Sequence, residues 1–156
     1  MNSKVAFLIG SESDRKLVEY SLDYFRFFDI EAEIIVMSAH RNPSDVKEFS
    51  NKAKDNGYSV LICGAGMAAH LAGAVKANTI LPVIGVPLPG GMMDGLDSLL
   101  STVQMPKGVP VATMSVGKSG AINSAIFCAE ILSLNNLKIE KKLLRFKENG
   151  SNLSGL

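Results

Sequence analysis

Five short apolar runs, separated by longer amphipathic stretches, constrain the fold of this 156-residue chain more than any other feature. Each run is apolar at most of its positions, which is typical of strands that are covered by helices on both faces. We therefore predict five parallel strands, at residues 5–9, 32–37, 58–62, 81–86 and 109–113.

The stretches between the runs have the spacing of crossover helices. Apolar residues recur every three or four positions, so each helix presents one stripe to the sheet. Pro43 favours a helix start in the second stretch and Gly57 favours its end, because proline fits the first helical turn and glycine fits the C-cap. The two stripes are Leu17, Tyr20, Tyr24 and Phe28, and then Val46, Phe49 and Ala53.

This alternation, with right-handed crossovers, predicts an α/β fold. The expected architecture is a flavodoxin-like three-layer αβα sandwich with a five-stranded parallel sheet plus C-terminal helices. The chain is long enough to bury one sizeable core and too short to favour two domains. We expect a single domain over residues 1–156.

The C-terminal third carries more apolar surface than one sheet face can cover. Residues 120–134 are apolar on nearly every side, which is typical of a buried helix. Residues 135–150 place Ile139, Leu143 and Phe146 on one stripe, with basic residues elsewhere. That stripe could cover its own domain, but we predict that it packs on a neighbouring subunit of a homo-oligomer. Residues 151–156 are expected to form a flexible tail.

Charge and hydropathy exclude several classes of partner. Sixteen basic and fifteen acidic residues leave a formal charge of +1, too little to attract nucleic acid or an anionic membrane at long range. No apolar run approaches the roughly 20 residues that span a bilayer. The start of the chain lacks the features of a signal peptide, so a cytoplasmic location is expected.

The two cysteines stand too far apart in the sequence for paired metal-ligand spacing. In a chain without a signal peptide, Cys63 and Cys128 are interpreted as buried, reduced thiols. Cys63 lies close to a glycine-containing loop, which leaves a role as a nucleophile as a weaker alternative.

Three polar loops follow three successive predicted strands, at residues 10–14, 38–41 and 64–70. In a parallel α/β sheet such loops meet at the carboxyl ends of the strands, where ligands bind. The three loops therefore predict a single site.

The first loop, Gly10-Ser11-Glu12-Ser13-Asp14, has the composition of a phosphate cradle. Ser11 and Ser13 offer hydroxyl donors at the start of a helix, where free N–H groups favour an anion. Asp14 could accept hydrogen bonds from ribose hydroxyls, so the loop fits a ribonucleotide monophosphate. It matches neither a Walker loop nor a dinucleotide fingerprint, and taken alone it is also compatible with an ordinary helix cap.

The second and third loops add a cation and two imidazoles. Arg41 can bind a phosphate through two hydrogen bonds, and His40 could move a proton to or from a ligand held by Arg41. Gly64 and Gly66 allow the backbone to approach a small planar or anionic group, although small residues also permit close helix packing. His70 is expected one turn into the next helix, where burial or capping contacts would also explain it.

A fourth segment, residues 85–95, is rich in glycine and proline. It is interpreted as a flexible flap that closes over the ligand and excludes water. A mobile connection or a subunit contact is the alternative.

These loops together resemble one family. The motifs Gly-Ser-x-Ser-Asp (10–14), Ser-Ala-His-Arg-x-Pro (38–43), Gly-Ala-Gly-x-Ala-Ala-His-Leu (64–71), Asp-Ser-Leu (97–99) and Gln-Met-Pro-x-Gly-x-Pro-Val-x-Thr (104–113) resemble the class I N5-carboxyaminoimidazole ribonucleotide mutases, the PurE family. The resemblance covers residues 4–148.

The resemblance implies a carboxyl shift on one small ribonucleotide, without metal, ATP or biotin. The carbamate loses carbon dioxide, which stays trapped until C4 of the aminoimidazole captures it, while His40 carries protons. By this resemblance, the phosphate is bound by Ser11, Ser13 and Arg41, and the ribose is bound by Asp14. The carboxylate or carbon dioxide is surrounded by Ala65, Gly66 and His70. Ser38 is implied to position the substrate or His40. A homo-octamer with active sites between subunits is also implied.

The chain departs from the family pattern at two positions near the third loop. Met67 stands where many relatives carry glycine, and Ala72 where proline is common. Neither change removes a residue implied to carry protons or bind phosphate.

Three other functions are weighed against the mutase. A class II aminoimidazole ribonucleotide carboxylase, which takes free carbon dioxide, shares the fold and the first two motifs, whereas 68–71 here match class I. A non-catalytic module could use the same loops only to sense a ribonucleotide. A thiol hydrolase would depend on Cys63.

Overall fold

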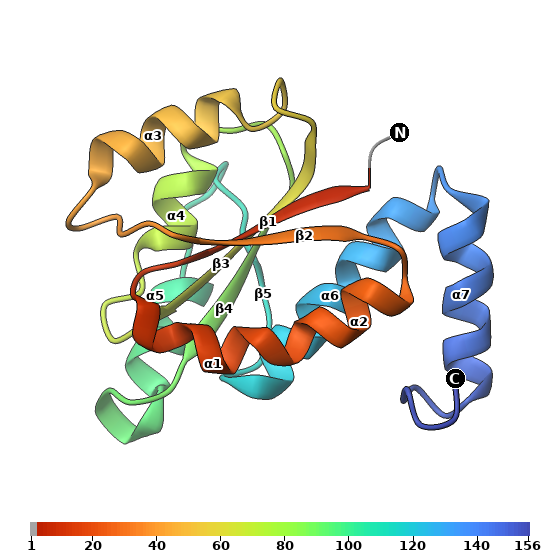
Figure 1. The fold of residues 1–156 in the computed structure, drawn as a ribbon. Coiled ribbons are helices and arrows are strands. Elements are labelled where there is room, and N and C mark those ends of the chain that lie inside the picture. The colour runs from red at the N-terminus through yellow and green to blue at the C-terminus, as the bar shows by residue number, and fades with distance from the viewer. Residues whose placement is uncertain (1–2) are drawn as a thin grey trace.

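The computed structural model describes residues 3–156, and its centre is a five-stranded parallel sheet (Figure 1). Met1 and Asn2, part of the segment in which no signal peptide was expected, lie outside the described residues. The strand order is β2-β1-β3-β4-β5. The strands are β1 (Lys4–Ile9), β2 (Glu31–Val36), β3 (Tyr58–Gly66), β4 (Val83–Leu88) and β5 (Ala112–Thr113).

Helices cover both faces of the sheet, which confirms the predicted three-layer α/β fold. One face carries α1, α2 and α6, with α7 packed outside α6; the other carries α3, α4 and α5 (Figure 1). The helical segments are η1 (Glu12–Asp14), α1 (Arg15–Val18), η2 (Glu19–Ser21), α2 (Leu22–Phe27), α3 (Pro43–Lys52), α4 (Leu71–Lys76), η3 (Met92–Asp94), α5 (Leu96–Val103), α6 (Lys118–Ser133) and α7 (Leu137–Glu148). None of the helices in the described part of the chain has the length and apolar character needed to cross a membrane.

Two strands extend further toward their carboxyl ends than the sequence predicted. β3 includes the first three residues of the expected third loop, because Gly64 pairs with Val86 and Gly66 with Leu88. β4 begins two residues later than expected and includes the first part of the expected flap. The Gly-Ala-Gly segment suggests a turn in the sequence, but both of its glycines occupy positions in the sheet. The part of the expected flap that lies outside the sheet is therefore residues 89–95.

The fifth strand is shorter than predicted. Only Ala112 and Thr113 pair with β4, instead of the whole run 109–113. Pro110 has no N–H to donate to a sheet. Just before it, Gly108 has a positive φ of 93° and the N–H of Val109 donates to Pro106 in a turn. These features delay pairing until residue 112.

The first helical stretch is irregular, and its buried stripe differs from the predicted one. Three members of the predicted stripe do face the core, because Phe28 is fully buried and Leu17 and Tyr24 pack against the cluster around it. Val18, Ser21 and Phe25 are buried as well, whereas Tyr20 is 48% exposed. Tyr20 instead lies under the ammonium group of Lys118, 3.9 Å from its ring centroid. The small Ser21 side chain faces inward because η2 packs closely against α6.

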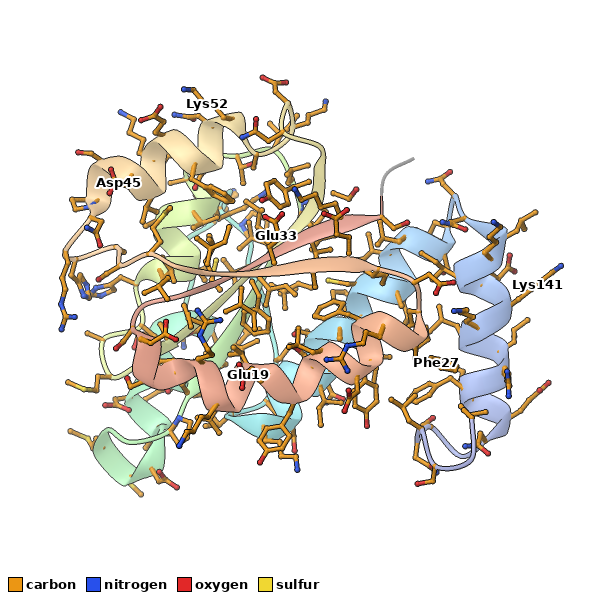
Figure 2. The ribbon with its side chains drawn as sticks, viewed as in Figure 1. Glu19, Phe27, Glu33, Asp45, Lys52 and Lys141 are labelled. Atoms are coloured by element: carbon orange, nitrogen blue, oxygen red, sulfur yellow. The ribbon has the colours of Figure 1, made fainter. Side chains whose placement is uncertain are left out.

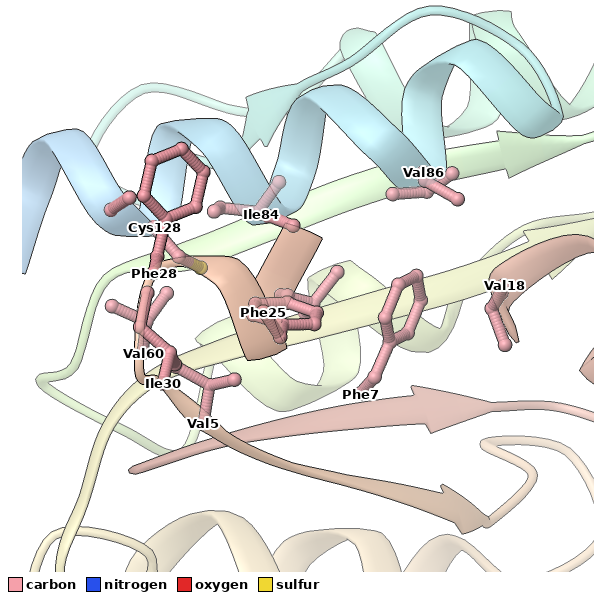
Figure 3. Close-up of a cluster of buried hydrophobic side chains, with 14 of the residues drawn as sticks. Val5, Phe7, Val18, Phe25, Phe28, Ile30, Val60, Ile84, Val86 and Cys128 are labelled. Carbon is pink, nitrogen blue, oxygen red and sulfur yellow. The ribbon is translucent and has the colours of Figure 1, made fainter. Parts of the chain in front are cut away.

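Two apolar clusters fill the layers on either side of the sheet. Figure 3 shows part of the larger cluster, in which Phe7 and Ile84 of the sheet meet Phe25 and Phe28. The smaller cluster joins β1 and β3 to α3 and α4. Val46 of α3 and Ala53 at its C-cap are buried in it, as their spacing predicted.

The apolar stripe of the last helix is buried within its own chain. Ile139, Leu143 and Phe146 are buried in the larger cluster, and the Phe146 ring lies 6.2 Å from that of Phe27. Figure 2 shows Phe27 directed from α2 toward α7, while Lys141 points away from the core. That this helix packs on a neighbouring subunit stays a prediction.

The last residues, predicted to be a flexible tail, fold back on the domain. Leu153 and Leu156 pack against the larger cluster. The side chain of Asn149 donates to the carbonyl of Asn152 at 3.0 Å and to that of Ser154 at 2.9 Å. Apolar contacts thus give residues 151–156 a defined path that their polar composition did not indicate.

Candidate functional site

A cleft of about 460 Å³ lies at the carboxyl ends of β1, β2, β3 and β4. All nine residues that the sequence analysis selected line this cleft, although they come from three loops. Seven further residues line the cleft that were not predicted as site residues, although several of them belong to the sequence motifs. The selected residues are Ser11, Ser13, Asp14, Ser38, His40, Arg41, Ala65, Gly66 and His70, and the others are Gly10, Ala39, Met67, Ala68, Leu71, Pro89 and Gly90.

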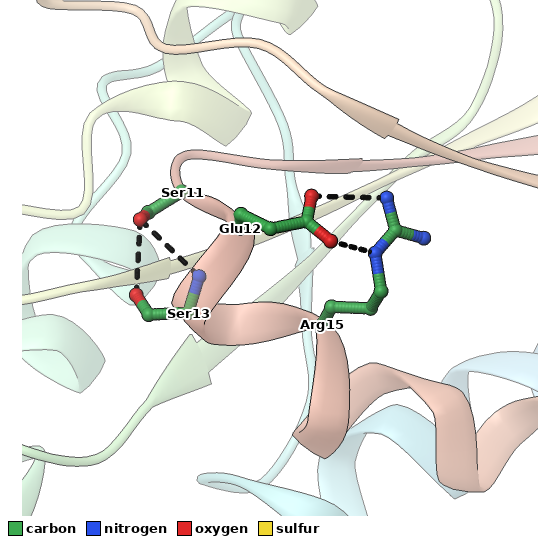
Figure 4. A network of polar contacts seen from close by, with 4 residues as sticks. All are labelled: Ser11, Glu12, Ser13 and Arg15. Atoms are coloured by element: carbon green, nitrogen blue, oxygen red, sulfur yellow. Dashed lines mark hydrogen bonds and ion pairs between the residues drawn. The ribbon is translucent and has the colours of Figure 1, made fainter.

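The first loop folds into a tight turn at the end of β1. Figure 4 shows Ser11 and Ser13 facing one another, with Arg15 turned toward Glu12. The Ser13 hydroxyl donates to Ser11 Oγ at 2.9 Å, and the Ser13 N–H donates to the same oxygen at 3.4 Å. The Glu12–Arg15 ion pair neutralises the charges beside the turn, and both serines line the cleft together with Asp14.

Asp14 ends this turn as a half-buried carboxylate. Burial raises the pKa of its carboxyl group, while hydrogen bonds from the backbone of Ser11 and the side chain of Ser13 oppose this shift. Within residues 3–156, Asp14 forms no ion pair. A ligand hydroxyl could therefore donate to this carboxylate without displacing a cation.

Ser38 shapes the second loop. Its hydroxyl oxygen accepts hydrogen bonds from the backbone N–H of His40 at 3.3 Å and of Arg41 at 3.2 Å. The Arg41 side chain is exposed and, among residues 3–156, has no ion-pair partner. The turn thus holds the backbone firmly and leaves the guanidinium able to bind an anion.

The two histidines of the chain meet in the cleft. His40 Nε2 lies 2.6 Å from His70 Nδ1, and the rings meet edge to face with centroids 4.9 Å apart. At this distance one nitrogen carries the hydrogen and the other accepts it, so the two tautomers depend on each other. The sequence predicted both residues at the site but gave no sign of this contact, because the two side chains are 30 residues apart.

The two glycines of the third loop have different surroundings. A Cβ atom at Gly64 would lie 3.3 Å from the Phe7 ring, so this glycine serves core packing. Gly66 lines the cleft. Next to it, Met67 has a positive φ of 52°, a backbone conformation that costs a residue with a Cβ atom roughly 1–2 kcal/mol. Glycine adopts this conformation freely.

Side chains of α5 fix the segment 89–95, which borders the cleft beside the third loop. Asp97 accepts a hydrogen bond from the N–H of Met92 at 2.9 Å. A Cβ atom at Gly91 would lie 2.1 Å from the same carboxylate, so this contact requires glycine. The Ser98 hydroxyl lies 2.8 Å from the carbonyl of Leu88. These two residues belong to the Asp-Ser-Leu motif, the one sequence signal that pointed to them.

Both cysteines are buried in the core. Burial raises the pKa of the Cys63 thiol far above its usual range, which opposes formation of the nucleophilic thiolate. Cys63 also does not line the cleft. Among residues 3–156, no group of three or more His, Cys, Asp or Glu side chains is arranged to hold a metal ion.

The fold and the cleft define an α/β ligand-binding domain whose site carries hydroxyls, a carboxylate, a guanidinium and two imidazoles. The sequence profile of the AIR carboxylase family matches residues 4–152. The chain therefore belongs to the AIR carboxylase family, which confirms the resemblance read from its loops.

Several named relatives match nearly the whole chain. The N5-carboxyaminoimidazole ribonucleotide mutase of Escherichia coli K12 is 41% identical over 90% of this chain and 83% of its own length. That of Bacillus subtilis is 44% identical over 96% and 92%, respectively. Among solved structures, Treponema denticola PurE superposes with a TM-score of 0.85 at 26% identity, over 95% of this chain and 91% of that one.

Proposed function

We propose that this protein is an N5-carboxyaminoimidazole ribonucleotide mutase of purine (IMP) biosynthesis. The observation that carries the proposal is one cleft that joins a serine-rich anion cradle and a free guanidinium to an imidazole pair. Curated relatives with this name match more than nine-tenths of the chain, which supports the proposal independently.

The substrate phosphate is bound by Ser11, Ser13 and Arg41. The two hydroxyls stand at the end of β1, and the exposed guanidinium of Arg41 supplies the positive charge. Paired hydrogen bonds from a guanidinium suit phosphate oxygens. Asp14, at the end of the same turn, then lies one sugar's width further along and accepts from the ribose hydroxyls.

The reaction is an isomerisation that needs no external reactant. The bond between N5 and the carboxyl carbon breaks to release carbon dioxide, and a bond from C4 to that carbon forms. N5 gains one proton and C4 loses one, so a single group that takes up and returns a proton completes the balance. His40 is suited to this step because imidazole donates and accepts protons near neutral pH.

Ala65, Gly66 and His70 surround the migrating carboxyl group. Small side chains at 65 and 66 leave room for carbon dioxide near the imidazole pair. Segment 89–95 closes over the cleft to keep the released molecule from solvent. Trapping of carbon dioxide is thus the main task of the walls of the site.

A class II carboxylase, which would use free carbon dioxide, is the alternative that an assay must separate. Purified protein is given either N5-carboxyaminoimidazole ribonucleotide or aminoimidazole ribonucleotide with modest bicarbonate, in both cases without ATP. The mutase proposal expects rapid conversion of the first substrate and little carboxylation of the second. The opposite preference would assign the chain to class II.

The protein is further proposed to act in the cytoplasm as a homo-octamer. Exposed apolar residues on η3 and α5, namely Met92, Met93, Leu100 and Val103, provide surface for contacts between subunits. A mass measurement in solution tests this assembly, and a stable monomer would contradict it.

A further inference from the structure

One hydroxyl of α5 ties the third loop to the body of the domain. Ser101 Oγ lies 3.2 Å from the carbonyl oxygen of Met67 and accepts from the N–H of Ala69 at 3.4 Å. It also contacts the carbonyl of Asp97, which is an ordinary bond of a helical serine to the preceding turn. The other two contacts reach 34 and 32 residues back along the chain. Ser101 therefore holds the residue on each side of Ala68.

This loop has a backbone conformation that needs such support. Met67 has a positive φ, which a residue with a Cβ atom adopts only at an energetic cost, and which persists only where neighbouring groups impose it. Its side chain is 63% exposed and gains little from packing. The single hydrogen of the Ser101 hydroxyl is shared between the carbonyls of Met67 and Asp97, while its oxygen accepts from the N–H of Ala69. These contacts act on both residues that flank Ala68.

The consequence of this support falls on His70. The N–H of His70 donates to the carbonyl of Ala68 at 2.9 Å, so its backbone follows the segment that Ser101 holds. His70 Nδ1 in turn meets His40 Nε2 at 2.6 Å. We infer that Ser101 is a positioning residue, which keeps His70 in contact with His40. The effect of this contact on turnover rests on the proposed mutase function, but the contact itself does not.

The first test observes the imidazole pair directly. Because the chain contains two histidines, the ring nitrogen signals in an NMR spectrum come from His40 and His70, and a His40→Asn sample assigns them. In Ser101→Ala, both sets of signals are expected to move toward those of separate imidazoles in tautomer exchange. Ser101→Thr, which keeps the hydroxyl, is expected to restore the wild-type signals.

A matched control removes a similar hydroxyl elsewhere. Ser124 is buried in α6, where its hydroxyl donates to the carbonyl of Ala121 at 2.7 Å. Ser124→Ala therefore loses one helix back-bond but leaves the cleft intact. It is expected to leave the histidine signals and the turnover unchanged, whatever its effect on stability.

Kinetics measure what the positioning contributes. A misplacement of one catalytic group by about 1 Å can cost up to a hundredfold in rate. We expect Ser101→Ala to lower kcat by between about ten- and a hundredfold. KM should change little, because the phosphate-binding residues belong to the other two loops.

A second substitution tests whether backbone strain links Ser101 to the pair. Glycine at position 67 adopts the positive φ without cost, so the loop no longer depends on the serine hydroxyl. In the double variant Ser101→Ala with Met67→Gly, the histidine signals should return most of the way from their positions in Ser101→Ala to their wild-type positions. Failure of this rescue would overturn the strain-based part of the inference.

The outcomes separate this inference from the proposed function. Unchanged histidine signals in folded Ser101→Ala overturn the inference, whatever the rate does. Changed signals with restoration by threonine support it. If the wild-type protein converts no mutase substrate, the proposed function fails, while the spectra still decide the role of Ser101.

Discussion

The two ends of the sheet treat their charged groups in opposite ways. At the amino end, Lys4 pairs with Glu33 at 2.9 Å, and Tyr58 donates a hydrogen bond to the same carboxylate. Figure 2 shows Glu33 on β2. At the carboxyl end, Asp14 and Arg41 have no ion-pair partner among residues 3–156. The first arrangement satisfies charges within the protein, and the second keeps them available for a ligand.

This difference has a thermodynamic counterpart. The hydrogen bond from Tyr58, together with that from Lys4, lowers the pKa of Glu33, whereas burial raises the pKa of Asp14. The charged form is therefore favoured at the amino end and disfavoured in the cleft. Groups in a ligand site commonly reduce stability in this way.

The largest effect is expected from His40→Asn. Loss of a general acid–base group typically costs between about a hundred- and ten-thousandfold in rate. We expect kcat to fall by that amount while calorimetry detects nucleotide binding close to that of the wild type. A ribonucleotide sensor, in contrast, would show no turnover in the wild type and would keep its ligand response in the variant.

Arg41→Ala should act on binding. Hydrogen bonds to charged groups contribute about 1.5–3 kcal/mol, so KM is expected to rise between about ten- and a hundredfold, as steady-state kinetics would measure. The KM of Arg41→Lys should lie between those of the wild type and Arg41→Ala, because lysine keeps the charge but lacks the planar guanidinium group. The surface residue Arg26 provides the control, and an equal effect of Arg26→Ala would show that the cleft has no special role.

Asp14→Asn should weaken binding but stabilise the fold. When folding raises the pKa of a carboxyl group, that group stabilises the protein fully at a pH below its pKa in the unfolded state. This contribution is lost as the pH rises through its pKa in the folded state. The wild-type protein thus bears a cost at neutral pH that the amide avoids. We expect a higher melting temperature for the variant near neutral pH and no difference in acid. A lower neutral melting temperature would show that the charged form is favoured.

Glu33→Gln should have the smallest effect on function. Because folding lowers the pKa of Glu33, its charge stabilises the protein at a pH above its pKa in the unfolded state. This contribution is lost as the pH falls through its pKa in the folded state. Urea unfolding should show a slightly less stable variant near neutral pH and convergence in acid. Turnover should be unchanged, and a clear loss of activity would remove the proposed contrast between the two ends.

The sequence predicted the fold and the membership of the cleft more accurately than the local boundaries. Alternation of apolar runs and helical stripes determines the sheet, because each buried strand needs covering on both faces. The nine selected residues share one cleft because parallel strands bring their carboxyl ends together. That topological rule needs no side-chain detail.

Features that depend on contacts between distant residues were not predictable. The close approach of η2 to α6 selected Ser21 as an inward residue, and no spacing rule indicates it. The contact between His40 and His70, and the bonds from Ser101, join residues about 30 positions apart. The strand character of residues 64–66 also depends on β4, which supplies their partners.

Helix α5 contacts both sides of the cleft, since Asp97 and Ser98 hold one loop and Ser101 holds the other. The two loops are thereby anchored to the same helix. If segment 89–95 closes over the substrate as proposed, a movement carried by α5 would also reach the segment that leads to His70. A small molecule that displaces α5 from the sheet would therefore be expected to inhibit the enzyme without binding at the phosphate cradle.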